Sequence, residues 1–87
     1  MPYIKQEDRK RFDEWLGGIP IPNTKGELEY CIFYLMKLHM EPLEANYTNL
    51  HDTVYAAQHC ADEFRRRYLD LRENTALVLN GDVDVPE

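Results

Sequence analysis

The sequence predicts an all-α protein: a short N-terminal helix, an extended proline-containing strap, and an antiparallel pair of long helices that form a hairpin. Apolar residues recur three and four positions apart over two long stretches, which is the period of a helix. Glycine and proline pairs separate those stretches. A chain of 87 residues has the length of one small domain. We therefore expect a single helical domain over residues 1–87, with flexible ends at 1–4 and 82–87.

The first helix is predicted over residues 5–16, "KQEDRKRFDEWL". Gly17 and Gly18 end it, because glycine adopts the backbone conformations that close a helix. Its narrow apolar stripe consists of Ile4, Phe12, Trp15 and Leu16. The following "IPIPN" of residues 19–23 contains two prolines, which exclude a helix and favour an extended strap.

Thr24 and Glu27 have the spacing of a capping box, in which each side chain accepts a hydrogen bond from the other's backbone amide. They predict that a second helix begins here and continues through "KGELEYCIFYLMKLHM" up to Glu41-Pro42. Apolar side chains surround most of this helix, and a three-helix monomer cannot easily cover them. We expect self-association into a homo-oligomer through an interface that includes Ile32, Phe33, Leu35 and Leu38.

A third, long helix is predicted from Leu50 to about Leu79, after a connection at residues 43–48. Its apolar residues alternate four and three apart, as in a coiled-coil contact. We call them the long-helix row: Leu50, Val54, Ala57, Ala61, Phe64, Tyr68 and Leu71. The predicted end signals are a cap at Thr48 or Asn49 and a left-handed stop at Asn80-Gly81, followed by the tail "DVDVPE".

Three consecutive arginines lie within this helix, between two aromatic residues of the long-helix row. Arg66 and Arg67 have acidic neighbours at helical spacing, which predicts a solvated surface of salt bridges. The expected pairs are Asp62–Arg66, Glu63–Arg67 and Arg66–Asp70. Arg65 and Arg72 lack partners four residues away and, being seven residues apart, are expected to share one face of the helix. That face is a candidate anion site, although a plain charged surface is the commoner role of such runs.

The start of the second helix is another candidate for anion binding. Its free backbone amides favour anions, and Lys25 with the Thr24 hydroxyl would hold a phosphate there, although capping alone also explains Thr24. Tyr30 and Tyr34 are candidates for stacking on a base. The predicted ligand-binding residues are thus Arg65, Arg72, Lys25, Thr24, Tyr30 and Tyr34. The competing interpretation pairs both arginines with acids of another helix, such as Glu29 or Glu44.

No pattern in the sequence marks an enzyme, since it shows no nucleophile motif, glycine-rich phosphate loop or paired-carboxylate signature. His59 and Glu63 have the spacing of two metal ligands, but no third ligand has suitable spacing. We therefore expect a non-enzymatic protein without a cofactor or a metal. Cys31 and Cys60 form no CxxC motif and are expected to be reduced thiols in the protein interior.

The net charge of −6 disfavours binding to nucleic-acid polymers and to anionic membranes, because both would repel the chain. No apolar stretch approaches the roughly 20 residues of a membrane-spanning helix. The N-terminus lacks the hydrophobic run of a secretory signal. These features predict a cytoplasmic protein.

Four segments carry a family resemblance: "GELEYCI" at residues 26–32, "NYTNLHD" at 46–52, "EFRRRY" at 63–68 and "NGDV" at 80–83. In order and spacing they resemble a family of small bacteriophage-encoded proteins of unknown function, with a GELxY, NY, EFxRR and NGDV pattern. The opening "YIKQEDRKRFD" is similar to the start of that family, so the resemblance covers nearly the whole chain. Residues 69–79 are more apolar than the family pattern. The resemblance implies a phage origin and action in the cytoplasm of the host.

A phage origin favours a small protein that binds a host component stoichiometrically. The first hypothesis is an oligomer that sequesters a small anionic, nucleotide-type signal molecule and so counters host defence, with arginines at subunit junctions binding the phosphates. The alternative is a protein–protein interaction module that docks onto a host protein through the second helix and inhibits it. The two hypotheses differ in whether that helix is closed within a homo-oligomer or open to a partner.

Overall fold

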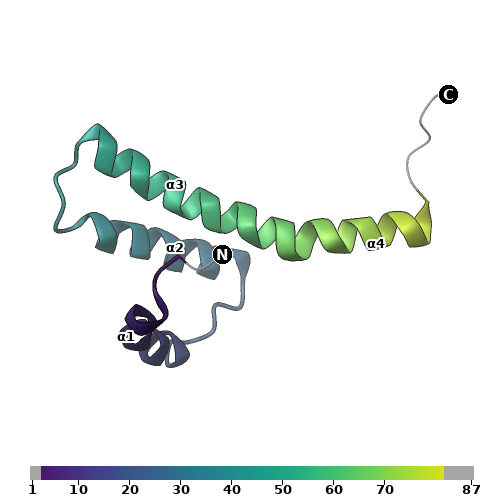
Figure 1. Cartoon of the computed structure of the whole chain (residues 1–87), viewed down its shortest axis with the longest axis horizontal. Helices are drawn as coiled ribbons and strands as arrows, with labels where there is room; N and C mark the ends of the chain where they lie inside the picture. The colour runs from purple at the N-terminus through teal and green to yellow at the C-terminus, as the bar shows by residue number, and fades with distance from the viewer. Residues whose placement is uncertain (1–2, 82–87) are drawn as a thin grey trace. The chain divides into compact units, whose positions relative to one another are not determined.

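The computed structural model of the chain describes residues 3–81, which form three helices and no strand. The elements are α1 (Gln6–Gly17), α2 (Lys25–Met40), and a third helix built of α3 (Tyr47–Phe64), the π turn η1 (Arg65–Leu69) and α4 (Asp70–Asn80). Figure 1 shows their order along the chain, and the predicted all-α class is confirmed. The chain divides into two compact units, up to Cys31 and from Ile32 onward, and each is described by itself. The predicted tail at residues 82–87 lies outside the described part.

The first helix, α1, begins and ends one residue later than the sequence predicted. Glu7 and Asp8 in its first turn place negative charge at the end where the helix dipole favours it. At the other end, the Gly18 backbone amide donates a hydrogen bond to the Trp15 carbonyl at 3.1 Å. The double glycine therefore ends the helix as predicted, and residues 19–23 are not helical.

A side-chain cap starts α2. The Thr24 Oγ1 accepts a hydrogen bond from the Glu27 backbone amide at 3.0 Å, and the Glu27 Oε1 accepts one from the Asn23 amide at 2.8 Å. The predicted cap is confirmed at Thr24, while the carboxylate reaches the amide of the preceding residue. α2 ends at Met40, whose carbonyl accepts a hydrogen bond from the Leu43 amide at 2.9 Å.

The cap of α3 is Asn46, so the prediction of Thr48 or Asn49 was wrong and the helix begins three residues earlier than expected. The Asn46 Oδ1 accepts a hydrogen bond from the Asn49 amide at 2.9 Å. The Asn49 side-chain amide donates to the Glu44 carbonyl at 2.9 Å, and the Asn49 carbonyl accepts from the Thr53 hydroxyl at 2.7 Å. These bonds order the connection before α3 and satisfy the half-buried and buried polar groups of its first turns.

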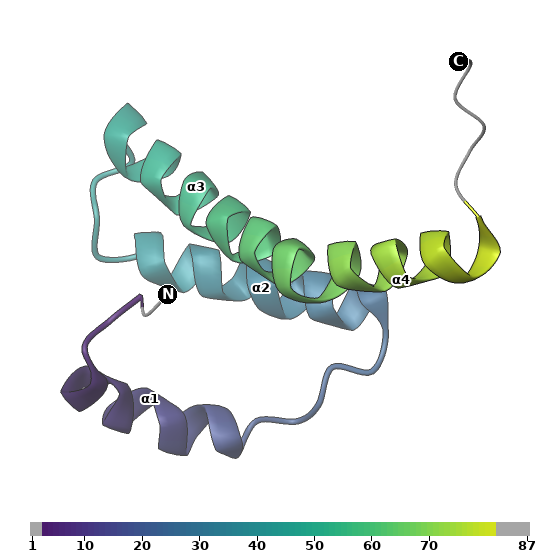
Figure 2. The same cartoon turned by 45° about the vertical axis from the view of Figure 1, so that its right-hand side comes forward.

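A π turn interrupts the third helix at Arg65–Leu69. The Asp70 backbone amide donates to the Arg65 carbonyl, five residues earlier, instead of making the four-residue bond of an α-helix. The extra residue rotates the side chains that follow by about 100° relative to an uninterrupted helix. The helix continues beyond the turn, as Figures 1 and 2 show, and it ends as predicted at Asn80, where Gly81 has a φ of 83°.

Hydrophobic burial is the largest departure from the prediction. Within residues 3–81 no hydrophobic residue is buried, and Thr53 alone is buried, at 6% exposure. The long-helix row was expected to be a buried contact, yet all of its members except the half-buried Ala57 are exposed. For Phe64, Tyr68 and Leu71 the reason is that no described residue covers the far part of the helix: every residue from Phe64 to Gly81 is exposed.

The two cysteines follow the same pattern. Cys31 and Cys60 are free thiols and both are exposed, so the expectation of interior thiols was wrong. Each lies on a helix whose residues are nearly all open to solvent. Among the described helices, none combines the length and the apolarity that crossing a membrane requires.

Candidate functional site

Glu63 organises the arginine run. The Arg66 guanidinium donates to both of its carboxylate oxygens, at 2.8 Å to Oε1 and 3.3 Å to Oε2, and the Arg67 Nε donates to Oε1 at 2.6 Å. These interactions, led by the hydrogen bond from Arg66, hold the pKa of the Glu63 carboxyl below its ordinary value. The predicted Glu63–Arg67 pair is confirmed. Arg66 also pairs with Glu63 instead of Asp62 or Asp70, because the π turn rotates Asp70 away from it.

Arg65 and Arg72 are the arginines that the sequence left without partners. Within residues 32–81 neither forms an ion pair. The expectation that they share one stripe assumed an uninterrupted α-helix and was wrong, because the π turn lies between them and rotates Arg72 by about 100°. The two guanidinium groups are therefore exposed but do not form one surface on a single chain.

The other candidate basic group has a local partner. The Lys25 Nζ donates to the Glu29 Oε1 at 2.7 Å, and this hydrogen bond raises the pKa of Lys25. The neighbouring Thr24 hydroxyl accepts the capping bond from Glu27. Both residues are exposed at the start of α2, so a ligand there would compete with an existing ion pair and an existing cap.

The remaining candidates from the sequence lie on α2 and are exposed. Tyr30 and Tyr34 expose 71% and 56% of their surface. The four residues expected at an oligomer interface are also open to solvent: Ile32, Phe33, Leu35 and Leu38. Thr24, Lys25 and Tyr30 belong to the unit that ends at Cys31, whereas the other candidates belong to the unit that begins at Ile32. Exposed apolar area, rather than a shared polar centre, is what the interface candidates of α2 have in common.

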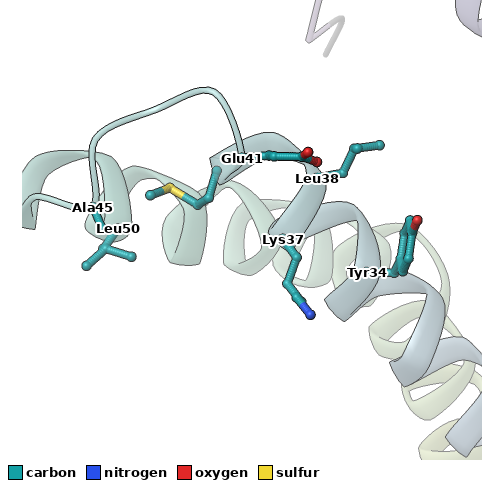
Figure 3. Close-up of a pocket in the computed structure, with 7 residues that line it drawn as sticks. Tyr34, Lys37, Leu38, Glu41, Ala45 and Leu50 are labelled. Atoms are coloured by element: carbon teal, nitrogen blue, oxygen red, sulfur yellow. The ribbon is translucent and has the colours of Figure 1, made fainter.

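A pocket that sequence reasoning missed lies where α2 ends and α3 begins. It is an open hollow of about 500 Å³, and we call it the α2 pocket. Its lining residues, shown in Figure 3, are Tyr34, Lys37, Leu38, Met40, Glu41, Ala45 and Leu50. Apolar groups dominate the lining, and one ammonium and one carboxylate stand beside them. The spacing of Lys37 and Glu41 permits a salt bridge, yet they form none with each other.

A second missed feature is a row of rings along α3, which we call the aromatic ladder: Tyr47, His51, Tyr55 and His59. Successive ring centroids lie 5.4, 4.3 and 6.1 Å apart. The four residues are four positions apart, which places them one above another on a helix face. The four-residue spacing is visible in the sequence, but alternating tyrosine and histidine residues are not a known signature of a binding site.

The metal hypothesis gains no support from the described residues. Residues 3–81 contain no group of three or more histidine, cysteine, aspartate or glutamate side chains placed to hold a metal ion. Of the two residues with ligand spacing, Glu63 accepts hydrogen bonds from two arginines, and the His59 ring lies 6.1 Å from the Tyr55 ring at an angle of 60°.

These observations define the class: a small all-α protein whose described helices expose large apolar side chains, and in which several charges within residues 32–81 form no ion pair in that part of the chain. The chain belongs to a family described as a domain of unknown function (DUF6899), whose model matches residues 1–83. Searches of curated proteins and of solved structures found no match. The expected membership of a family of unknown function is thereby confirmed.

Proposed function

We propose that the chain is a non-enzymatic binding protein that assembles into a homo-oligomer and sequesters a small anionic, nucleotide-type molecule. One observation carries the proposal: α2 exposes apolar side chains around most of its surface, while no described hydrophobic residue is buried. A folded chain that hides none of these groups gains stability by burying them against other molecules.

Self-association is the first step of the proposal. Ile32, Leu35 and Leu38 expose 42%, 42% and 48% of their surface, and fully burying such a side chain contributes about 1.5–3 kcal/mol. In the proposed arrangement, an antiparallel hairpin of α2 and the third helix covers only one side of α2. The remaining apolar sides are then available to further subunits, which makes a homo-oligomer the arrangement that buries them most completely.

Ligand binding is the second step. Arg65 and Arg72 are exposed, permanently charged and without ion pairs in residues 32–81, and guanidinium groups bind phosphates bidentately. Because the π turn rotates the two arginines apart, a shared phosphate site needs arginines from two subunits. The exposed rings of Tyr30 and Tyr34 offer stacking surfaces for a base.

The biological setting of the proposal is action in the cytoplasm of a phage-infected host, where removing a nucleotide signal would counter host defence. It rests on the pattern of residues 26–32, 46–52, 63–68 and 80–83 and on the stoichiometric mode of small binding proteins. The alternative is a module that docks onto a host protein. The same exposed face of α2 supports it, because an amphipathic or apolar helix is a common docking element.

Titration calorimetry with mono-, di- and cyclic nucleotides tests the proposal, together with native mass spectrometry of protein purified from cells. We expect an oligomer and measurable heat for at least one nucleotide class. Replacing both Arg65 and Arg72 with alanine should abolish that heat and leave the melting temperature nearly unchanged. The matched control replaces Arg66 and Arg67, which removes equal charge from the same run. An oligomer that gives no heat with any nucleotide refutes the ligand, and a stable monomer favours the docking module.

A further inference from the structure

An apolar helix end and an apolar pocket lie within the same unit, which begins at Ile32. We call Leu77, Val78 and Leu79 the α4 tip, and they expose 41%, 84% and 77% of their surface. The α2 pocket is floored by apolar side chains, those of Leu38, Met40, Ala45 and Leu50. Covering either surface removes apolar area from water, which is favourable.

The tip cannot reach the pocket of its own chain. Leu50 lines the pocket and also lies in the first turns of the continuous helix that ends in the tip. From Leu50 to Val78 that helix is about 40 Å long, at roughly 1.5 Å per residue. The helix stays continuous through the π turn, and Figures 1 and 2 show α4 at the opposite end of it from the loop that follows α2. The tip therefore meets such a pocket only on another molecule.

We propose that the α4 tip of one molecule docks into the α2 pocket of a second copy. This inference rests on the proposed self-association and adds which two surfaces meet. The tip and the pocket are different surfaces, so the contact is heterologous, and its repetition closes a ring or extends a filament.

One charge beside each surface is complementary to the other. Lys37 and Glu41 line the pocket, and within residues 32–81 neither forms an ion pair. Glu73 lies four residues before Leu77, on the same helix face, and it also forms none in that part of the chain. Seating Leu77 in the pocket brings Glu73 of one copy towards Lys37 of the other, whereas a nonpolar partner segment would leave both unpaired.

The exposure of α4 supplies a further argument for a partner. All 11 of its residues are exposed. Most helical stability in proteins comes from a covered apolar face. Seating the tip in a second copy covers part of α4 in this way.

Disulfide crosslinking between two distinguishable chains tests the docking. Both chains carry Cys31→Ser and Cys60→Ser; one adds Ala45→Cys, and the other adds Val78→Cys and a size tag. We expect mild oxidation of the mixture to give a heterodimer joined between positions 45 and 78. The matched control replaces Ala45→Cys by Gln58→Cys, an exposed polar position on α3, and should give at least about tenfold less product.

A charge substitution provides the second measurement. Val78→Glu should raise the concentration at half-assembly by at least about tenfold, whereas Gln58→Glu, which adds the same charge elsewhere, should leave it unchanged. Assembled protein that yields no 45–78 crosslink, with an unaltered assembly of Val78→Glu, overturns the docking and leaves self-association standing. A monomer in sedimentation overturns both proposals.

Discussion

The backbone amide of Asp70 donates its hydrogen bond to the carbonyl oxygen of Arg65, one residue further back than in an α-helix. This single bond marks the π turn that separates α3 from α4. It decides how the two halves of the third helix are oriented, because every side chain beyond it is rotated by about 100°. π turns are rare and are frequently found at functional positions.

Deleting Leu69 should convert the π turn into an α turn, since Asp70 would then follow Arg65 by four residues. The helix content measured by circular dichroism should be retained, because the deletion restores regular hydrogen bonding. Assembly and nucleotide binding should each change by less than about tenfold, since the deletion removes the residue that the π turn accommodates and the faces of α4 keep their orientation. Leu69→Ala keeps the turn and is the control. Assembly or binding that weakens by more than this in the deletion variant alone would show that the turn itself contributes to the contact.

Thr24→Ala should destabilise the protein by about 1 kcal/mol, because it removes the oxygen that accepts the Glu27 amide. For a chain of this size that corresponds to a fall in melting temperature of roughly 4–8 °C. Thr24→Ser keeps the capping oxygen and should restore most of the loss. A Thr24→Ala variant that melts normally but no longer binds nucleotide would assign this hydroxyl to a ligand instead.

Phe64→Ala should cost the chain little by itself. The ring is 65% exposed, and among the described residues it contacts the ring of Tyr68, at 4.7 Å between centroids. Losing such an aromatic pair costs about 0.5–1.5 kcal/mol beyond the area effect. A buried contact in the long-helix row would instead cost about 3–5 kcal/mol. Urea unfolding at several protein concentrations distinguishes an exposed ring from a buried one. A large loss of stability that is seen only at high protein concentration would place the ring in a contact between subunits.

The Glu63 carboxylate should make acid unfolding steeper. Its pKa is lowered in the folded chain, chiefly by the Arg66 hydrogen bond, from an ordinary value of 4.5. A carboxyl with a depressed folded pKa adds stability above its unfolded pKa and loses it as the pH falls through the folded value. Glu63→Gln should therefore flatten the stability profile below pH 4.5. Glu73→Gln is the control, and an equal flattening by both variants would deny Glu63 a particular role.

The ends of the helices were largely predictable because each depends on a few local residues. Gly17-Gly18, the Thr24 cap and Asn80-Gly81 all act where the sequence placed them. The start of α3 was missed because Asn46 was assigned to the connection. Asparagine is as good an N-terminal cap as the threonine and asparagine that were expected to cap the helix, Thr48 and Asn49.

The π turn and the burial pattern could not be read from the sequence for a different reason. The residues "RRRYL" have ordinary to good α-helix propensities, so no local preference in the sequence indicates a π turn. Periodicity identified the long-helix row but not what covers it, since the same spacing serves a contact within one chain or between chains. The expected shared stripe of Arg65 and Arg72 was wrong for this reason, because it depended on an uninterrupted helix.

The cap, the aromatic ladder and the buried hydroxyl of α3 all lie in the first part of the third helix. Local stability therefore falls along this helix from its N-terminal to its C-terminal end. Each ring contact from Tyr47 to His59 adds the few tenths of a kcal/mol that four-residue neighbours supply, about 0.2–0.5 kcal/mol. Thr53 adds a shielded hydrogen bond to the Asn49 carbonyl, whereas the corresponding bond from Thr75 to the Leu71 carbonyl in α4 is exposed to water. In deuterated water the amides near Thr53 therefore exchange their protons slowest and those of α4 fastest, so that the helix opens by unzipping from its C-terminal end.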